Sequence, residues 1–271
     1  MSTYDQFLVF VNDSVGLERT LRLFQSLFLI TASYPLPLHY FSTLLSLSTA
    51  SSSASPILAQ TIAHGIVQKL NFVRRFFRLF KFLHCFHSAQ TLYSSSGLNK
   101  TAWVDGMGNT FMGLYLLLDA SLIVDALKID RFGVWTPEWE RAITVEAQRF
   151  WLFALVSGVV SAGLKMVDVW ALQPTVAVEV MAPEEKSELK EKEESEKLVE
   201  KKDAEAAAVR KQIRVLQRDL VANALDIVLP GVVVGWIQAT PGIVGLAMFT
   251  TTILTMQGVW ERCGKTVGSA A

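Results

Sequence analysis

Five basic side chains in a short aromatic stretch are the residues of this sequence whose type and spacing most favour binding chemistry. They lie in QKLNFVRRFFRLFKFLHCFH, residues 68–87, and no carboxylate accompanies them over residues 66–83. Placed about 100° apart, as in an α-helix, Arg74, Arg78 and Lys81 fall close together, opposite an apolar half. Phosphate oxygens of anionic lipids suit such a row, because each cation near the leaflet contributes about 1 kcal/mol to binding. The predicted lipid-binding residues are Lys69, Arg74, Arg75, Arg78 and Lys81.

The apolar half of the same stretch is rich in phenylalanine and is predicted to enter one leaflet as a wedge. A helix with bulky aromatics on one side and only cations on the other has the composition of an in-plane interfacial helix. Packing into a soluble bundle is the alternative, and nucleic-acid binding is disfavoured because the rings face away from the cations. The predicted wedge residues are Phe72, Phe76, Phe77, Phe80 and Leu83.

Other residues with chemical potential do not form a recognisable site. His84 and His87 share a helix face, but no second ligand pair has a usable spacing for a metal. Cys85 and Cys263 are the only cysteines and do not indicate a disulfide framework. No nucleophile elbow, P-loop or dinucleotide fingerprint is present. We therefore expect no metal, no cofactor and no enzymatic activity.

The elements that must position the basic stretch are predicted to be helices in or on a membrane. Apolar residues make up 51% of the chain, charged residues 18%, and the mean hydropathy is +0.34. The predicted fold is all-α: a membrane-associated helical bundle with amphipathic interfacial helices and one to three hydrophobic membrane helices. Residues 150–172 and 241–260 are the expected spans, since about 20 apolar residues cross a bilayer. Residues 227–239 are too short to span and are expected to be re-entrant or interfacial.

The chain divides by composition into five regions. Prolines in SYPLPLHY, 33–40, must interrupt a helix, and the serine-rich run 42–56 is expected to be a loop. Residues 184–205 hold ten acids and six bases. The regions are an N-terminal amphipathic part with the serine-rich loop, 1–56; one basic remodelling helix, 57–93; a hydrophobic part, 94–172; a charged linker or helix, 173–208; and a C-terminal part, 209–271.

Two further features leave alternatives open. Asp119, Asp125 and Asp168 lie in apolar surroundings and could serve a membrane channel, although a structural role at helix faces is favoured. Gly231 and Gly235 are spaced for close helix contact in lipid. Two crossings would place both ends of the chain on one side and the charged stretch on the other, unless 227–260 forms a re-entrant hairpin.

Four patterns, in this order, resemble those of the peroxin-11 family over most of the chain. The first, VGLERTLRLFQSL, matches at Gly16, Glu18, Leu21, Arg22, Leu23 and Gln25. The second, VRRFFRLFKFL, matches at Arg74, Arg75, Arg78, Lys81 and Phe82. The third is the pair Tyr115 and Asp119. The fourth matches at Asn223, Asp226, Pro230, Gly242, Gly245 and Trp260. The chain is similar to divergent, fungal-type members.

The resemblance implies a function and partners. It implies a peroxisomal membrane protein with cytosolic termini that elongates the organelle membrane before fission, its basic helix inserted in the cytosolic leaflet. It also implies self-association, contact with anionic phospholipid, and recruitment of the fission machinery and the membrane-protein import receptor. No nucleic-acid partner is expected. A metabolite channel, or a helical adaptor that recruits division machinery without deforming lipid, are the alternatives.

Overall fold

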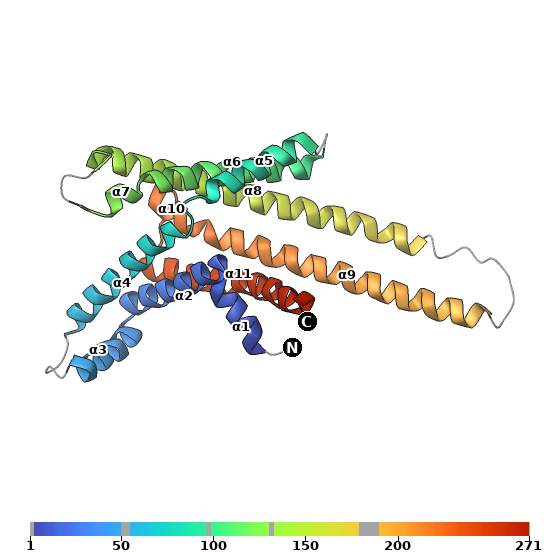
Figure 1. Ribbon diagram of the computed structural model, residues 1–271, viewed down its shortest axis with the longest axis horizontal. Helices are drawn as coiled ribbons and strands as arrows, with labels where there is room; N and C mark the ends of the chain where they lie inside the picture. The colour runs from blue at the N-terminus through green and yellow to red at the C-terminus, as the bar shows by residue number, and fades with distance from the viewer. Residues whose placement is uncertain (1–2, 50–54, 96–98, 130–132, 179–189, 271) are drawn as a thin grey trace.

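The computed structural model of the chain describes residues 3–49, 55–95, 99–129, 133–178 and 190–270, and the regular structure within these ranges is entirely helical (Figure 1). This confirms the all-α prediction. The helices are α1 (Thr3–Asn12), α2 (Ser14–Ser33), α3 (Pro35–Thr49), α4 (Pro56–Phe76), α5 (Lys81–Ser95), α6 (Lys100–Ser121), α7 (Ile123–Ala126), α8 (Pro137–Val178), α9 (Lys190–Asp226), α10 (Val228–Val234) and α11 (Pro241–Ala270).

Short-range signals set many of the helix boundaries. The side chains of Asp13, Ser55 and Asn99 each accept a hydrogen bond from a backbone N–H in the first turn of α2, α4 and α6. Pro35 ends α2 and opens α3, as the sequence predicts, because a proline has no N–H to continue a helix but fits its first turn. Pro56 and Pro241 also stand at helix starts.

The serine-rich run differs from the expected loop over its first part. α3 continues to Thr49, and the hydroxyls of Ser42 and Ser46 donate to the carbonyls of His39 and Thr43 one turn earlier. Such back-bonding lets serine remain within a helix. The prediction of a loop is therefore wrong for residues 42–49, which are helical, and residues 50–54 lie outside the described residues.

The single helix expected over 57–93 is two helices in the structure. α4 ends at Phe76, α5 begins at Lys81, and the residues between them form a turn. Backbone N–H groups there donate three residues back: Arg78 to Arg75, Leu79 to Phe76, and Lys81 to Arg78. This tighter pattern redirects the chain. We call residues 74–81 the basic turn.

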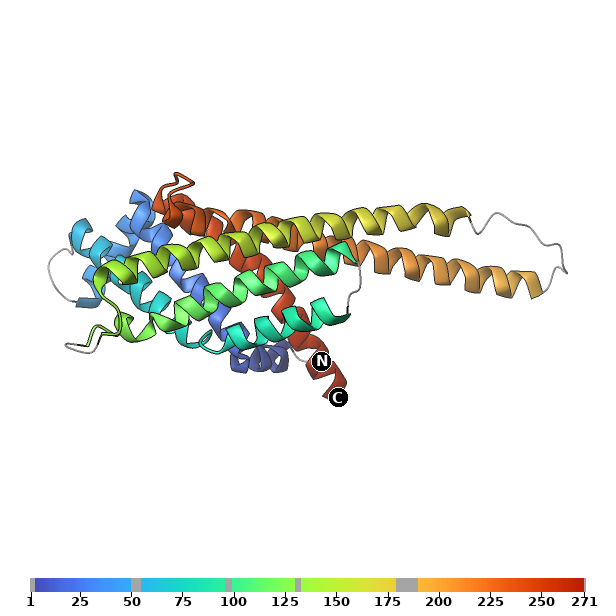
Figure 2. The same cartoon turned by 90° about the horizontal axis from the view of Figure 1, so that it is seen from above.

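The helices form two groups joined by α9. α6 packs between α5 and α8, whereas α2 packs on α4 and α11. α9 contacts α8 on one side and α11 on the other. In Figures 1 and 2 the α8 and α9 helices run side by side beyond the remaining helices as a long arm.

α8 and α11 run in the same direction. Asn223 of α9 lies against Gly158 of α8. Trp236, later in the chain, packs at a tilt against Phe153, earlier in α8. On the other side, Arg218 pairs with Glu261 of α11 while Asp226 meets Thr251. α9 is therefore antiparallel to both neighbours, and the start of α9 and the end of α11 point to the same end of the molecule (Figure 2). The parallel course of α8 and α11 does not fit two successive crossings that separate the charged stretch from the C-terminus, and the side of the membrane that each end faces stays a prediction.

The buried apolar core is small for a chain of this length. One cluster joins Tyr115 and Leu116 of α6 to Ala147 of α8, and another joins Phe10 of α1 to Val259 and Cys263 of α11. The chain exposes 17862 Å², against roughly 12,000 Å² for a compact monomer of 30.1 kDa. Much apolar surface is therefore left for lipid or another protein to cover.

Candidate functional site

The basic turn is tied to α2 by Arg74. Its Nε and Nη2 donate to Oε1 of Glu18, at 2.9 and 2.7 Å, and its Nη1 donates to Oε1 of Gln25 at 2.5 Å. Arg74 is 6% exposed and Glu18 3%. In this conformation the guanidinium has no access to lipid phosphate, so the expected role of Arg74 as a lipid ligand is not met here.

Arg75 and Arg78 tie the same turn to α6. Arg75 Nε lies 3.3 Å from one carboxylate oxygen of Asp119, and Arg78 Nη2 lies 3.2 Å from the other. Arg78 also donates to the hydroxyl of Tyr115 at 3.2 Å, with its guanidinium carbon 5.9 Å from the centre of that ring. These two cations are therefore also bound within the protein.

A third buried ion pair connects α2, α9 and α11. Arg22 Nη2 donates to Asp226 Oδ1 at 2.5 Å, and Thr251 Oγ1 donates to the same oxygen at 2.6 Å. Arg22 is 4% exposed, Asp226 7% and Thr251 fully buried. The charged residues of the four sequence patterns, apart from Lys81, thus pair with one another across helices, which sequence reasoning missed.

The pKa values of the first pair follow from burial and charge. Burial raises the pKa of Glu18, but the charge of Arg74 and its hydrogen bonds outweigh burial and lower it from 4.5 to about 2. Burial is also the largest influence on Arg74 and lowers its pKa to about 10 against the opposing charge of Glu18. Both groups are charged at neutral pH.

The remaining predicted lipid ligands are more accessible. Lys69 is exposed on α4 and Lys81 is half-buried at the start of α5. Burial lowers the pKa of Lys81 from its usual value, against the opposing charge of Glu18. Two of the five predicted cations therefore stand near the surface, and three are bound inside.

Three of the five predicted wedge residues are exposed, within the basic turn or close to it. Phe76 is 47% exposed, Phe80 70% and Leu83 58%. Phe72 and Phe77 are half-buried, and the ring of Phe72 meets Phe76 edge-on at 5.1 Å. Exposed rings of this size on a turn that is ion-paired to two other helices present apolar surface at a fixed position.

The glycine pair has a role different from helix contact. The N–H groups of Trp236 and Ile237 donate to the carbonyl of Gly231, and Gly235 ends α10 with φ of +86°. A Cβ on Gly231 would lie 2.5 Å from the side chain of Ile237. Both glycines therefore serve the chain reversal after α10, because one leaves room for Ile237 and the other adopts a left-handed conformation.

Two of the three carboxylates considered for a channel are bound to other groups of the protein. Asp119 binds Arg75 and Arg78, and Asp125 accepts hydrogen bonds from the backbone N–H groups of Val134 and Trp135. Asp168 is exposed on α8. Within the described residues no group of three or more His, Cys, Asp or Glu side chains could hold a metal ion.

Two described helices are long and apolar enough to cross a membrane: Pro137–Ala171 of α8 and Pro241–Gly268 of α11. In each, 28% of the most apolar window is buried inside the protein. A core helix of a soluble protein is mostly buried, whereas these two helices leave most of their most apolar windows unburied. The fold and the site thus define a helical, membrane-associated protein with buried ion pairs beside an exposed aromatic turn.

Comparison with known families agrees with this class. The family model described as peroxisomal biogenesis factor 11 matches residues 4–260 of 271. The chain belongs to this family, which confirms the resemblance drawn from the sequence patterns. No curated protein and no solved structure matches the chain. Membership implies a role in peroxisome proliferation at the peroxisomal membrane, in a family not known for enzymes.

Proposed function

We propose that this chain bends and elongates the peroxisomal membrane before fission by inserting the exposed aromatic side of the basic turn into the cytosolic leaflet. The observation that supports this most directly is the exposure of Phe76, Phe80 and Leu83 in the same stretch of chain as the accessible cations Lys69 and Lys81. Burial of apolar area in lipid is favourable by about 25 cal/mol per Å². Insertion into one leaflet only enlarges that leaflet and favours curvature.

The internal ion pairs give the arginines a structural role, which is to hold the basic turn against two other helices. Arg74 fixes the turn to α2, and Arg75 and Arg78 fix it to α6, so the phenyl rings are presented by a braced turn. Lys69 and Lys81 are the cations placed to meet lipid phosphates in this conformation, each contributing about 1 kcal/mol. Self-association and binding of the fission machinery and of an import receptor, with both termini in the cytosol, are part of the same proposal and rest on the family.

The test uses full-length protein in anionic vesicles. Wild-type protein is expected to draw tubules, and Phe76→Glu with Phe80→Glu is expected to abolish them. The matched control is Leu36→Glu with Leu44→Glu on α3, two apolar residues that are 73% and 64% exposed and lie away from the turn. If wild-type protein incorporates without deforming vesicles, or if the control loses tubulation equally, the wedge mechanism fails.

A further inference from the structure

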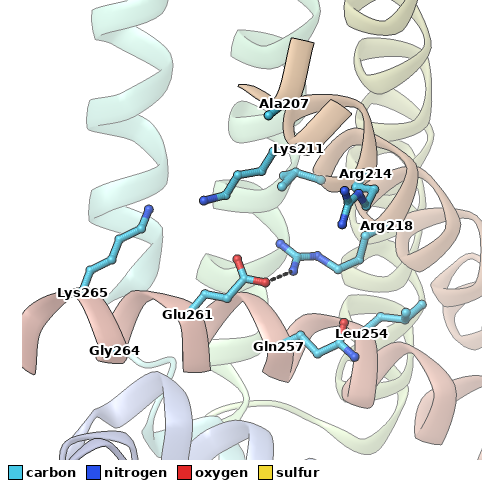
Figure 3. A pocket seen from close by; sticks show the side chains of 10 residues that line it. Ala207, Lys211, Arg214, Arg218, Leu254, Gln257, Glu261, Gly264 and Lys265 are labelled. Carbon is cyan, nitrogen blue, oxygen red and sulfur yellow. Dashed lines mark hydrogen bonds and ion pairs between the residues drawn. The ribbon is translucent and has the colours of Figure 1, made fainter. Parts of the chain in front are cut away.

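A groove between α9 and α11 lies away from the basic turn and belongs to no other feature described above (Figure 3). Its volume is about 840 Å³, within the range of ligand sites. It lies where the two helices are adjacent, and the contact of Arg218 with Glu261 of α11 forms part of its lining. The lining residues are Ala207, Lys211, Arg214, Val215 and Arg218 of α9, and Leu254, Gln257, Glu261, Gly264 and Lys265 of α11.

The lining is strongly basic. Lys211, Arg214 and Arg218 are spaced three and four residues apart and share one face of α9. Lys265 rises from α11 toward the same space, and Glu261 is the one carboxylate that lines the groove (Figure 3). Four lining cations therefore face one lining acid, and Asp219 beside the groove also lies 3.8 Å from Arg218.

The single acid neutralises only part of this charge. Glu261 is 3.4 Å from Arg218 and its side chain is 55% exposed, so their pairing is weak. Lys211, Arg214 and Lys265 form no ion pair in the part of the chain that the structure describes. Gathered cations without partners repel one another, and an anion that enters between them relieves that repulsion.

We propose that this groove binds a multivalent phosphate group carried by a membrane lipid headgroup. Several cations around one open space suit a ligand with more than one negative charge, since arginine and lysine bind phosphate oxygens through charge-assisted hydrogen bonds. The charge-free run of α11 ends at Trp260, and Glu261 and Lys265 follow it. The groove therefore opens where the apolar part of a candidate span ends, which is the depth of lipid headgroups. Leu254 and Val215 offer apolar surface to the adjoining lipid. This site is independent of the proposed wedge.

Detergent-solubilised full-length protein, with fluorescent phosphatidylinositol bisphosphate in the micelles as the probe, tests the proposal. Lys211→Gln with Arg214→Gln is expected to weaken binding roughly tenfold or more. Ala207→Trp fills the groove without changing charge and is expected to weaken binding too. Glu261→Gln removes the only lining acid and is expected to strengthen it.

The matched control is Lys100→Gln with Arg141→Gln, two exposed cations on α6 and α8 outside the groove. It removes the same charge and is expected to leave binding unchanged. Equal weakening in the control, or equal binding of phosphatidylserine at the same total charge, overturns the proposal. Soluble inositol trisphosphate carries the same phosphate groups and is expected to displace the lipid probe, so a failure to displace it overturns the phosphate chemistry.

Discussion

Arg74 and Glu18, 56 residues apart in the chain, form a buried pair in which two guanidinium nitrogens donate to one carboxylate oxygen. The pair lies between α4 and α2, where neither group has water to replace its partner. A buried pair of this kind need not stabilise a fold more than apolar residues would, but loss of one partner leaves the other charge buried alone.

Glu18→Gln is therefore expected to be destabilising. The neutral amide leaves the Arg74 charge uncompensated, and such losses are about 3–5 kcal/mol. Thermal unfolding of detergent-solubilised protein measures the effect. The matched control is Glu146→Gln, whose carboxylate pairs with Arg149 on the surface and is 50% exposed, and we expect a change of about 1 kcal/mol or less. Equal losses in the two variants would contradict a special role for the buried pair.

Acid is expected to weaken the same contact. The folded pKa of Glu18 is about 2 and its ordinary value is 4.5. Because the folded value is lowered, the stabilisation is present above about pH 4.5 and is lost as the pH falls toward 2. This difference between the folded and the ordinary pKa corresponds to a contribution on the order of 3 kcal/mol to the free energy of unfolding. Melting temperatures of wild type should fall more steeply over this window than those of Glu18→Gln, and parallel curves would show that other groups dominate.

Arg22 and Asp226 are expected to behave as a coupled pair. Arg22→Met or Asp226→Leu alone leaves one buried charge and should cost about 3–5 kcal/mol. The double variant leaves neither charge, so its loss should be smaller than the sum by about 1–3 kcal/mol. Urea or thermal unfolding of all four proteins completes the cycle. Additive losses would mean that the two side chains do not depend on each other.

Substitution by alanine should lower the stability of the protein at Gly16 and raise it at Gly65. A Cβ on Gly16 would lie 2.1 Å from the backbone carbonyl oxygen of Phe10, so Gly16→Ala must force α1 away from α2 and destabilise. A Cβ on Gly65 has nothing within 4 Å, and Gly65→Ala is expected to stabilise α4 by up to about 1 kcal/mol. Thermal unfolding of the two variants makes the comparison. Tolerance of alanine at Gly16 would argue against the close α1–α2 corner.

The parallel course of α8 and α11 predicts where tags are protected. When isolated peroxisomes are treated with protease, a tag within 179–189 and a tag after residue 271 should both be cleaved or both be protected. The reason is that α9 returns between the two candidate spans. A tag within 130–132, before α8, should have the opposite fate. Opposite fates for the first two tags would show that the helices cross in opposite directions.

The sequence predicted the helical class, the family and several helix boundaries because these depend on local features. Pro35 interrupts the helix where it must, and the apolar run after Pro241 forms one long helix. The partners of Arg74 and Arg75 could not be found in this way, because a helical wheel does not show which distant helix faces a polar side. One signal was available. Glu18, Arg22 and Gln25 share a face of 14–33, and the acid-free basic stretch needs acids from elsewhere.

The break between α4 and α5 was also missed, since residues 66–83 keep a helical period through the turn. The apolar residues of that period were read as one continuous face. The turn instead places Phe80 farther out than Phe76, with 70% of the residue exposed against 47%. The spacing of apolar residues in the sequence predicted which aromatic residues form the proposed wedge. It could not predict the direction of the chain at the turn, because that depends on contacts with α2 and α6.

The basic turn is anchored to both groups of helices, through Arg74 to α2 and through Arg78 to α6. If Phe80 inserts as proposed, a bilayer that resists bending would push back on it, and this load would pass through the turn to two anchor points at once. Two separated anchors resist torque, whereas one would let the turn swivel. On the proposed mechanism the mechanical load of a bent membrane would thereby be shared between the two helix groups, instead of falling on α4 and α5 alone.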